Sequence, residues 1–219
     1  MLISYTDLLG FRIGTSEGVI GRVRDCYVDE ATWTVRYLVA DTGDAKPGKR
    51  VLLAPSTVTT VDRSRLVVST HLTMPQVTGC PDWDMDKPIS RQIEAAYRAH
   101  FGWGQWWKSR IRIDQAMLPD DMAAVRAIVA AAEDGDRPLL RSCHEITSYR
   151  LQAAAGPVGP VVDVLMDDRT WQVDAVVIRI GIEHRALKAE HLQRIRWLDG
   201  AVYSDATPDV LAVAPDHPI

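Results

Sequence analysis

Three aspartates at alternate positions in the segment DWDMD have the spacing that opens a calcium-binding EF-hand loop. Such a loop requires glycine at its sixth position, where the chain turns sharply, and a bidentate glutamate at its twelfth. Counting from Asp82, those two positions hold Lys87 and Ile93. The motif therefore fails, and the segment is interpreted as a polar loop that leads into a helix.

The histidines have carboxylate neighbours but not the spacing of a metal site. His184 and His191 lie beside Glu183 and Glu190, and no four-ligand pattern follows them. The HEITS segment lacks the second histidine of a zinc-protease motif, and no glycine-rich phosphate loop or nucleophile elbow is present. We therefore predict no catalytic residue, no metal and no cofactor, and a protein that is not an enzyme. An enzyme with scattered catalytic residues is kept as an alternative, because such a set is invisible in sequence.

The densest group of aromatic residues lies in the segment YRAHFGWGQWW, which contains Tyr97, Phe101, Trp103, Trp106 and Trp107. One interpretation is packing of this segment against the rest of the fold. The other is a partner-binding patch, because tryptophan and tyrosine are frequent interface hot spots. A stacking platform for single-stranded nucleic acid is disfavoured, because few cations interleave with the rings. Trp103 and Trp107 are our candidates for a dimer or partner surface.

A modest basic run, HRALKAEHLQRIRW, places four cations near the C-terminal end: Arg185, Lys188, Arg194 and Arg196. A solvated face is the default interpretation. The alternative is a contact with RNA or with anionic headgroups, because a local cation cluster can act despite a negative total charge.

The composition is that of an ordinary globular chain of 219 residues, with 47% hydrophobic and 25% charged residues. A net charge of −4 gives no global attraction to nucleic acid or to anionic membranes. The cysteines are far apart and odd in number, so we interpret them as buried hydrophobes in a reducing compartment. We find no signal-peptide pattern and no apolar run near the ~20 residues of a membrane span. A cytoplasmic protein without a membrane span is expected.

The chain contains an internal repeat. Residues 2–43 align with residues 140–181 without a gap, at a constant offset of 138, and 13 of the 42 aligned pairs are identical. With small gaps the similarity continues, so that the copies cover about 2–81 and 140–215. A duplicated domain is the interpretation.

Each copy predicts a β-hairpin, because period-two alternation flanks the four-residue turns DEAT and DDRT. Asp29 and its equivalent Asp167 stand where a turn needs a side-chain acceptor for its own backbone. The shared Trp33 and Trp171 are predicted core residues at the strand start. Among the shared glycines, Gly18 and Gly156 suit a tight turn, and Gly21 and Gly159 a bend or bulge.

Residues 82–139 repeat nothing and are predicted to be helical. Ser90 suits a helix N-cap with Gly102 as the stop, and a second helix would begin with Pro119 in its first turn and end before Gly135. An exposed aromatic face would be an aggregation-prone patch. We therefore expect this insert to clasp the two copies into one body.

Together the two copies, carried by the pattern LLGFRIGTSEGVIGRVRDCYVDEATWTVRYLVADTG…VLLAPSTVTTVD, resemble the PRC-barrel family. That family is named for the cytoplasmic domain of the photosynthetic reaction centre H subunit, and it includes a domain of a ribosome maturation factor. The resemblance implies a mainly β chain of two small PRC-type β-barrels, at residues 1–81 and 140–219, with a helical insert at 82–139. The H subunit carries an N-terminal membrane helix, and no apolar run of that length is present in this sequence.

The resemblance further implies a non-enzymatic adaptor that assembles with protein partners of unknown identity. A homodimer is one form such an assembly can take. A ribosome- or RNA-associated factor that uses the basic run between Arg185 and Arg196 is the alternative, with RNA the less favoured partner.

Overall fold

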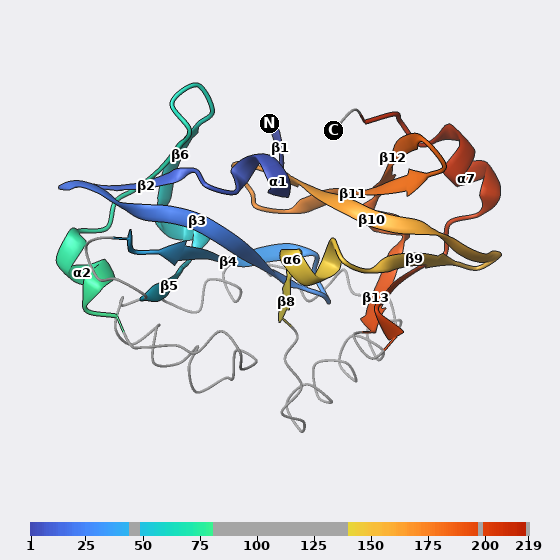
Figure 1. Ribbon diagram of the computed structural model, residues 1–219, viewed down its shortest axis with the longest axis horizontal. Helices are drawn as coiled ribbons and strands as arrows, with labels where there is room; N and C mark the ends of the chain where they lie inside the picture. Colours follow the sequence, from blue (N-terminus) through green and yellow to red (C-terminus); the bar gives the residue numbers. More distant parts are fainter. Residues whose placement is uncertain (44–48, 81–139, 197–198, 218–219) are drawn as a thin grey trace, which may run out of the picture.

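The computed structural model describes residues 1–43, 49–80, 140–196 and 199–217, and these residues are mainly β (Figure 1). The prediction of a mainly β chain is confirmed. The predicted helical insert at 82–139 lies outside the described residues. None of the described helices is long and apolar enough to cross a membrane.

Both repeats have the same order of elements. The first contains β1 (Leu2–Ser4), α1 (Tyr5–Leu8), β2 (Arg12–Thr15), β3 (Gly18–Asp29), β4 (Thr34–Asp41), β5 (Arg50–Leu53), η2 (Pro55–Thr57), β6 (Val58–Asp62), β7 (Val67–Thr70) and α2 (Met74–Thr78). The second contains β8 (Leu140–Ser142), α6 (Cys143–Ile146), β9 (Arg150–Ala153), β10 (Gly156–Asp167), β11 (Val173–Ile180), β12 (Glu183–Lys188), η4 (Ala189–His191), β13 (Leu192–Arg196), β14 (Ala201–Ser204) and α7 (Pro208–Val213).

The two sheets have the same strand order, β5-β4-β3-β2-β7-β6 in one and β12-β11-β10-β9-β14-β13 in the other. In each sheet the second and the last strands of the repeat, β2 with β7 and β9 with β14, pair in parallel, and the other pairs are antiparallel. Within the described residues no pairing joins β5 to β6 or β12 to β13. Two open sheets are therefore observed, and closed barrels are not.

The long hairpin of each repeat forms as its sequence predicts. Asp29 Oδ1 accepts the amide of Ala31 at 3.0 Å, and Asp167 Oδ1 accepts the amide of Thr170 at 2.7 Å. These bonds satisfy turn amides that have no partner in the strand ladder. The tryptophan that follows each turn is buried, with 6% of Trp33 and 4% of Trp171 exposed. The prediction of a turn acceptor and a core tryptophan is confirmed in both copies.

The shared glycines are required by the backbone. Gly18 and Gly156 have φ of 141° and 127°, a region that L side chains rarely adopt. Gly21 and Gly159 lie at the predicted bulges, and a Cβ there would stand 1.8 Å and 2.0 Å from carbonyl oxygens of the neighbouring strand. At these two positions the backbone of β4 or β11 comes closer than any side chain allows.

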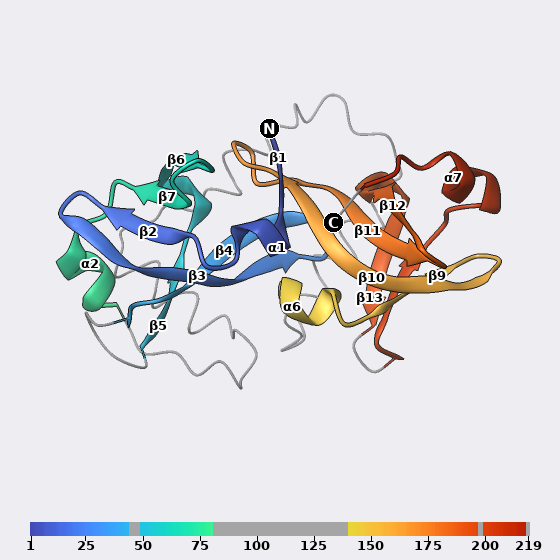
Figure 2. The same ribbon diagram turned by 45° about the horizontal axis from the view of Figure 1, so that its top comes forward.

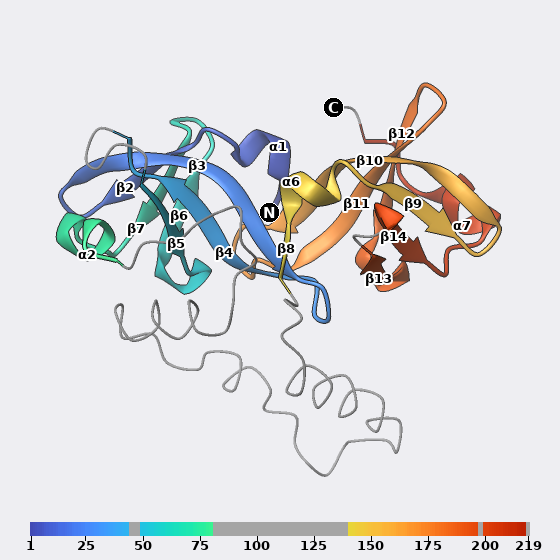
Figure 3. The ribbon, with the colours of Figure 1, turned by 60° about the horizontal axis from the view of Figure 1, so that its bottom comes forward.

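The repeats exchange their first strands. β1 pairs with β10 of the second repeat, and β8 pairs with β3 of the first repeat, at equivalent registers (Figures 2 and 3). Leu2 lies opposite Asp167, and Leu140 lies opposite Asp29. The boundary between the repeats in sequence is thus not the boundary between the two sheets.

The centre of the seam between the repeats is an antiparallel contact of the two hairpin turns. The amide of Val35 donates to the carbonyl of Trp171 at 2.8 Å, and the amide of Val173 donates to the carbonyl of Trp33 at 2.7 Å. Both tryptophans have positive φ, 50° and 58°, which is rare for a bulky side chain. The reciprocal bonds and the burial of both rings hold this conformation. One hydrophobic core contains residues of both repeats, so the described chain is a single body.

Candidate functional site: an apolar groove in the second repeat

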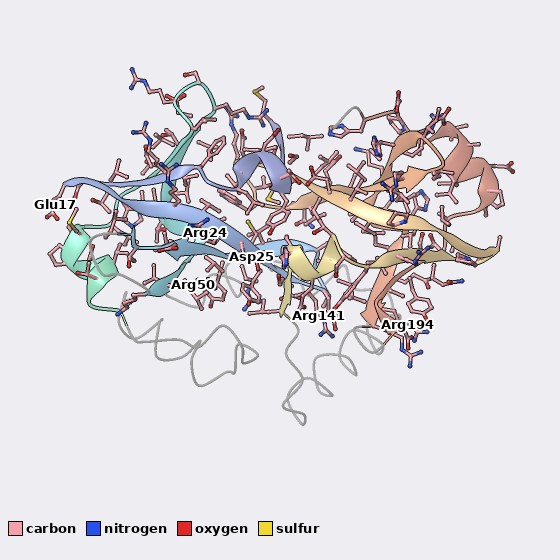
Figure 4. The ribbon with its side chains drawn as sticks, viewed as in Figure 1. Glu17, Arg24, Asp25, Arg50, Arg141 and Arg194 are labelled. Atoms are coloured by element: carbon pink, nitrogen blue, oxygen red, sulfur yellow. The ribbon has the colours of Figure 1, made fainter. Side chains whose placement is uncertain are left out.

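Two buried carboxylates of the seam, Asp25 and Asp163, hold the exchanged segments. Asp25 accepts the Ser142 hydroxyl at 2.6 Å and the amide of His144 at 3.2 Å. Asp163 accepts the amide of Thr6 at 3.1 Å, so each aspartate binds the first turn of the short helix from the other repeat. Figure 4 shows Asp25 between the two repeats, beside α6. Burial raises the pKa of Asp25, while the hydrogen bond from Ser142 and those from the backbone oppose that rise.

A groove of about 550 Å³ lies at the outer end of the second repeat. The turn between β9 and β10, the start of β12 and the helix α7 form its walls. Its lining is mostly apolar and includes Val158, Ile180, Ala206, Pro208, Leu211 and Ala212. The volume is within the range of ~300–1,000 Å³ that is usual for ligand pockets.

The polar residues of the groove are an ion pair. The Arg185 guanidinium donates to Glu183 Oε2 at 2.6 Å from Nη2, and Nη1 donates to the carbonyl of Ala214 at 3.1 Å. The hydrogen bond to Glu183 raises the pKa of Arg185 above its ordinary value. Because the charges of Arg185 and Glu183 neutralise each other, the groove has an apolar floor and no net charge from this ion pair at its edge. Such a site suits the binding of an apolar group better than proton transfer.

The first repeat provides an internal comparison for this groove. Arg12 pairs with Val67 and the equivalent Arg150 pairs with Ala201, so residues after this point correspond at an offset of 134. The helix N-caps Thr73 and Thr207 have the same offset. By this correspondence α7 is the equivalent of α2.

In the first repeat the equivalent space is filled by larger side chains. Leu72 corresponds to Ala206, Met74 to Pro208 and Ile20 to Val158. Leu72 and Ile20 are 2% and 3% exposed. Val77 of α2 is fully buried, whereas α7 has no buried residue. The groove therefore results from small side chains under a helix that the first repeat packs against its core.

The two helices are also fastened differently. In the first repeat the Lys49 ammonium donates to the carbonyls of Thr78 and Cys80, at 3.1 Å and 2.5 Å. Glu183 stands at the position of Lys49 and cannot donate to a carbonyl. Arg185, two residues further along the strand, binds the carbonyl of Ala214, which is the equivalent of Cys80. The longer reach of arginine thus fastens the end of α7 and leaves the groove open beside it.

Two exposed apolar residues adjoin lining residues of the groove in sequence. Ile182 adjoins Glu183 in the turn before β12 and is 96% exposed, and Val213 adjoins Ala212 in α7 and is 80% exposed.

The predicted basic residues come from two strands. Arg185 and Lys188 lie on β12, and Arg194 and Arg196 lie on β13, at opposite ends of the strand order. Lys188 pairs with Asp174 at 2.6 Å, and Arg196 pairs with Asp199 at 3.2 Å. Arg194 projects away from the sheet, with its guanidinium 5.0 Å from the centre of the Tyr203 ring (Figure 4). Of the four, only Arg185 lines the groove.

The predicted partner-binding residues Trp103 and Trp107 lie outside the described residues, as do the other aromatic residues of that segment. The groove was not predicted from the sequence. A signal for it exists in the repeat itself, because aligning the copies puts Ala206 opposite Leu72 and Ala155 opposite Glu17. Smaller side chains at several equivalent positions of the second copy indicate that it has a space which larger side chains fill in the first copy.

Two comparisons with known proteins assign no family to this chain. No family model matches it, and no curated protein is similar to it.

Proposed function

We propose that this protein is a non-enzymatic adaptor of the PRC-barrel type, which acts in the cytoplasm and binds a protein partner at the groove of its second repeat. The PRC-type assignment is supported by the sequence pattern shared by both copies. It is further supported by the agreement of hairpin, bulge and turn glycine with that pattern. The observation that carries the binding proposal is the groove, because the same fold fills this space in the first repeat.

The occupant we propose is an aliphatic side chain of a partner protein. In the first repeat the position of Ala206 holds the buried Leu72, so an aliphatic side chain suits the polarity of this part of the groove. Burial of such a side chain contributes about 1.5–3 kcal/mol. A stable interface buries ~800 Å² on each partner, which is more than one side chain provides. Ile182 and Val213 are the exposed residues over which the contact would extend.

The proposal is tested by affinity capture from native lysate with the tagged full chain, followed by mass spectrometry. Two variants block the groove in different ways. Ala206→Leu fills it with the residue type of the first repeat, and Ala212→Arg places a charge on its exposed wall. Ala31→Arg is the matched control, because Ala31 is exposed in the hairpin turn of the first repeat and the substitution is the same.

We expect a set of proteins that the wild-type chain and Ala31→Arg recover equally and that both groove variants lose. If the recovered set does not depend on the groove, the binding proposal is wrong. Recovery of ribosomal components that depends steeply on salt, and that is insensitive to both groove variants, would favour the RNA-associated alternative.

A further inference from the structure

Two of the three cysteines meet across the seam. Tyr27 of β3 lies opposite Ser142 of β8 in an antiparallel register, and this pair is the last of the ladder. Cys26 precedes Tyr27 on β3, and Cys143 follows Ser142 as the first residue of α6, so the two cysteines are neighbours just beyond the paired residues. A hydrogen bond joins their side chains, which brings the two sulfurs within reach of each other.

Burial and side-chain direction agree with this placement. Alternation along β3 puts Cys26 on the same side as Val28, and all three residues, Cys143 included, are fully buried. Burial is the main cause of a strongly raised pKa at Cys143, and a hydrogen bond to Cys26 adds to the rise. The two sulfurs are therefore neighbours in a dry part of the seam.

The pairing is specific to one of the two strand exchanges. At the equivalent place in the other exchange stand Val164 and Tyr5. The third cysteine, Cys80, follows α2 at the far end of the first repeat, where its carbonyl accepts the Lys49 ammonium. Cys26 and Cys143 are 117 positions apart in sequence, so the strand exchange alone brings them together.

We propose that Cys26 and Cys143 are a redox pair that forms a disulfide and thereby joins the two repeats covalently. The oxidant is a low-molecular-weight disulfide such as oxidised glutathione. One cysteine thiolate attacks it, which forms a mixed disulfide and releases one glutathione. The second cysteine attacks the protein sulfur of that mixed disulfide, which closes the protein disulfide and releases the second glutathione. The two thiol protons end on the two glutathione thiols, and the two electrons reduce the oxidant.

Access to the pair requires a local opening of the seam. β8 and α6 are short, with 3 and 4 residues, and they lie next to the covalent link with the preceding segment of the chain. Opening of this short element exposes both thiols while the hairpins stay paired. In a reducing compartment the dithiol form dominates, so the disulfide forms when the glutathione pool becomes oxidised.

The test uses the full chain with Cys80→Ser, which leaves the pair as its two thiols. The protein is unfolded in urea and refolded in a buffer of reduced and oxidised glutathione. We expect whole-protein mass spectrometry to show the loss of two hydrogen masses, and a peptide map to link Cys26 with Cys143. A cross-link over so long a loop restricts the unfolded chain, so Tm should rise by roughly 5–15 °C relative to the reduced protein.

The matched control adds Cys26→Val, which introduces the residue type found at the equivalent position 164. We expect this variant to fold, to form no internal disulfide and to show a Tm that does not depend on glutathione. Two free thiols after refolding, glutathione adducts without ring closure, or a disulfide that lowers Tm would each overturn the proposal.

Discussion

A reciprocal exchange of one residue between the repeats tests the origin of the groove. Leu72 is 2% exposed in the first repeat, and truncation of a buried leucine to alanine costs about 2–5 kcal/mol of unfolding free energy. The converse change, Ala206→Leu, adds three carbon atoms where the groove has space for them. At ~0.8 kcal/mol for each buried carbon the upper limit is ~2.4 kcal/mol. Partial exposure and lost rotamer freedom reduce this, so we expect a gain of ~0.5–2 kcal/mol.

The assay is urea unfolding at 25 °C, with the slope of the transition compared among variants so that changes in midpoint report stability. Ala40→Leu is the control for the added volume, because Ala40 is fully buried in β4 away from the groove. Overpacking there should cost about 1–3 kcal/mol. A loss of more than ~1 kcal/mol in Ala206→Leu would refute the reasoning, because it would mean that no space exists at that position.

Two further predictions concern the shared residues of the repeat. Gly21→Ala should lower the free energy of unfolding by ~2–4 kcal/mol, because the new Cβ would stand 1.8 Å from the carbonyl oxygen of Asp41. Gly14→Ala is the control: its Cβ would have its nearest neighbour at 3.6 Å, so the same urea assay should show a change within ~1 kcal/mol. Equal effects would contradict the close approach. The second prediction concerns Asp25, whose pKa in the folded protein is raised above 3.8. The protonated form therefore stabilises the folded state below pH 3.8, and this contribution is lost as the pH rises through the folded pKa. Relative to wild type, Asp25→Asn should gain up to ~1.4 kcal/mol per pH unit across that window; a constant difference from pH 4 to 7 would contradict it.

The hairpins could be predicted because their determinants are local. Alternation sets which side chains are buried, and the acceptors Asp29 and Asp167 select the turn. The bulge glycines, Gly21 and Gly159, could also be identified, because both copies share them. The reason that glycine is required there is a contact with a neighbouring strand, which the sequence alone does not reveal. The interpretation of the cysteines as buried hydrophobes is confirmed for all three. The proximity of Cys26 and Cys143 was not predicted, since no local pattern reports a contact between segments of different repeats.

The strand exchange could not be predicted from periodicity. Alternation determines which face of a strand is buried but not the strand with which it pairs. The side-chain pattern of β1 would therefore suit pairing with either β3 or β10. The exchange is decided by the seam, where Asp25 and Asp163 each accept hydrogen bonds from the other repeat's first helical turn. These are non-local contacts between positions more than a hundred residues apart.

The claim that the groove of the second repeat is a protein-binding site is tested most directly by calorimetric titration of the purified partner. The titrated proteins are the wild-type chain, Ala212→Arg and Ala31→Arg, each full length. We predict that Ala212→Arg raises the Kd at least about tenfold, equivalent to ~1.4 kcal/mol, and that Ala31→Arg leaves it within about twofold. The same Kd for all three proteins would contradict the proposed site.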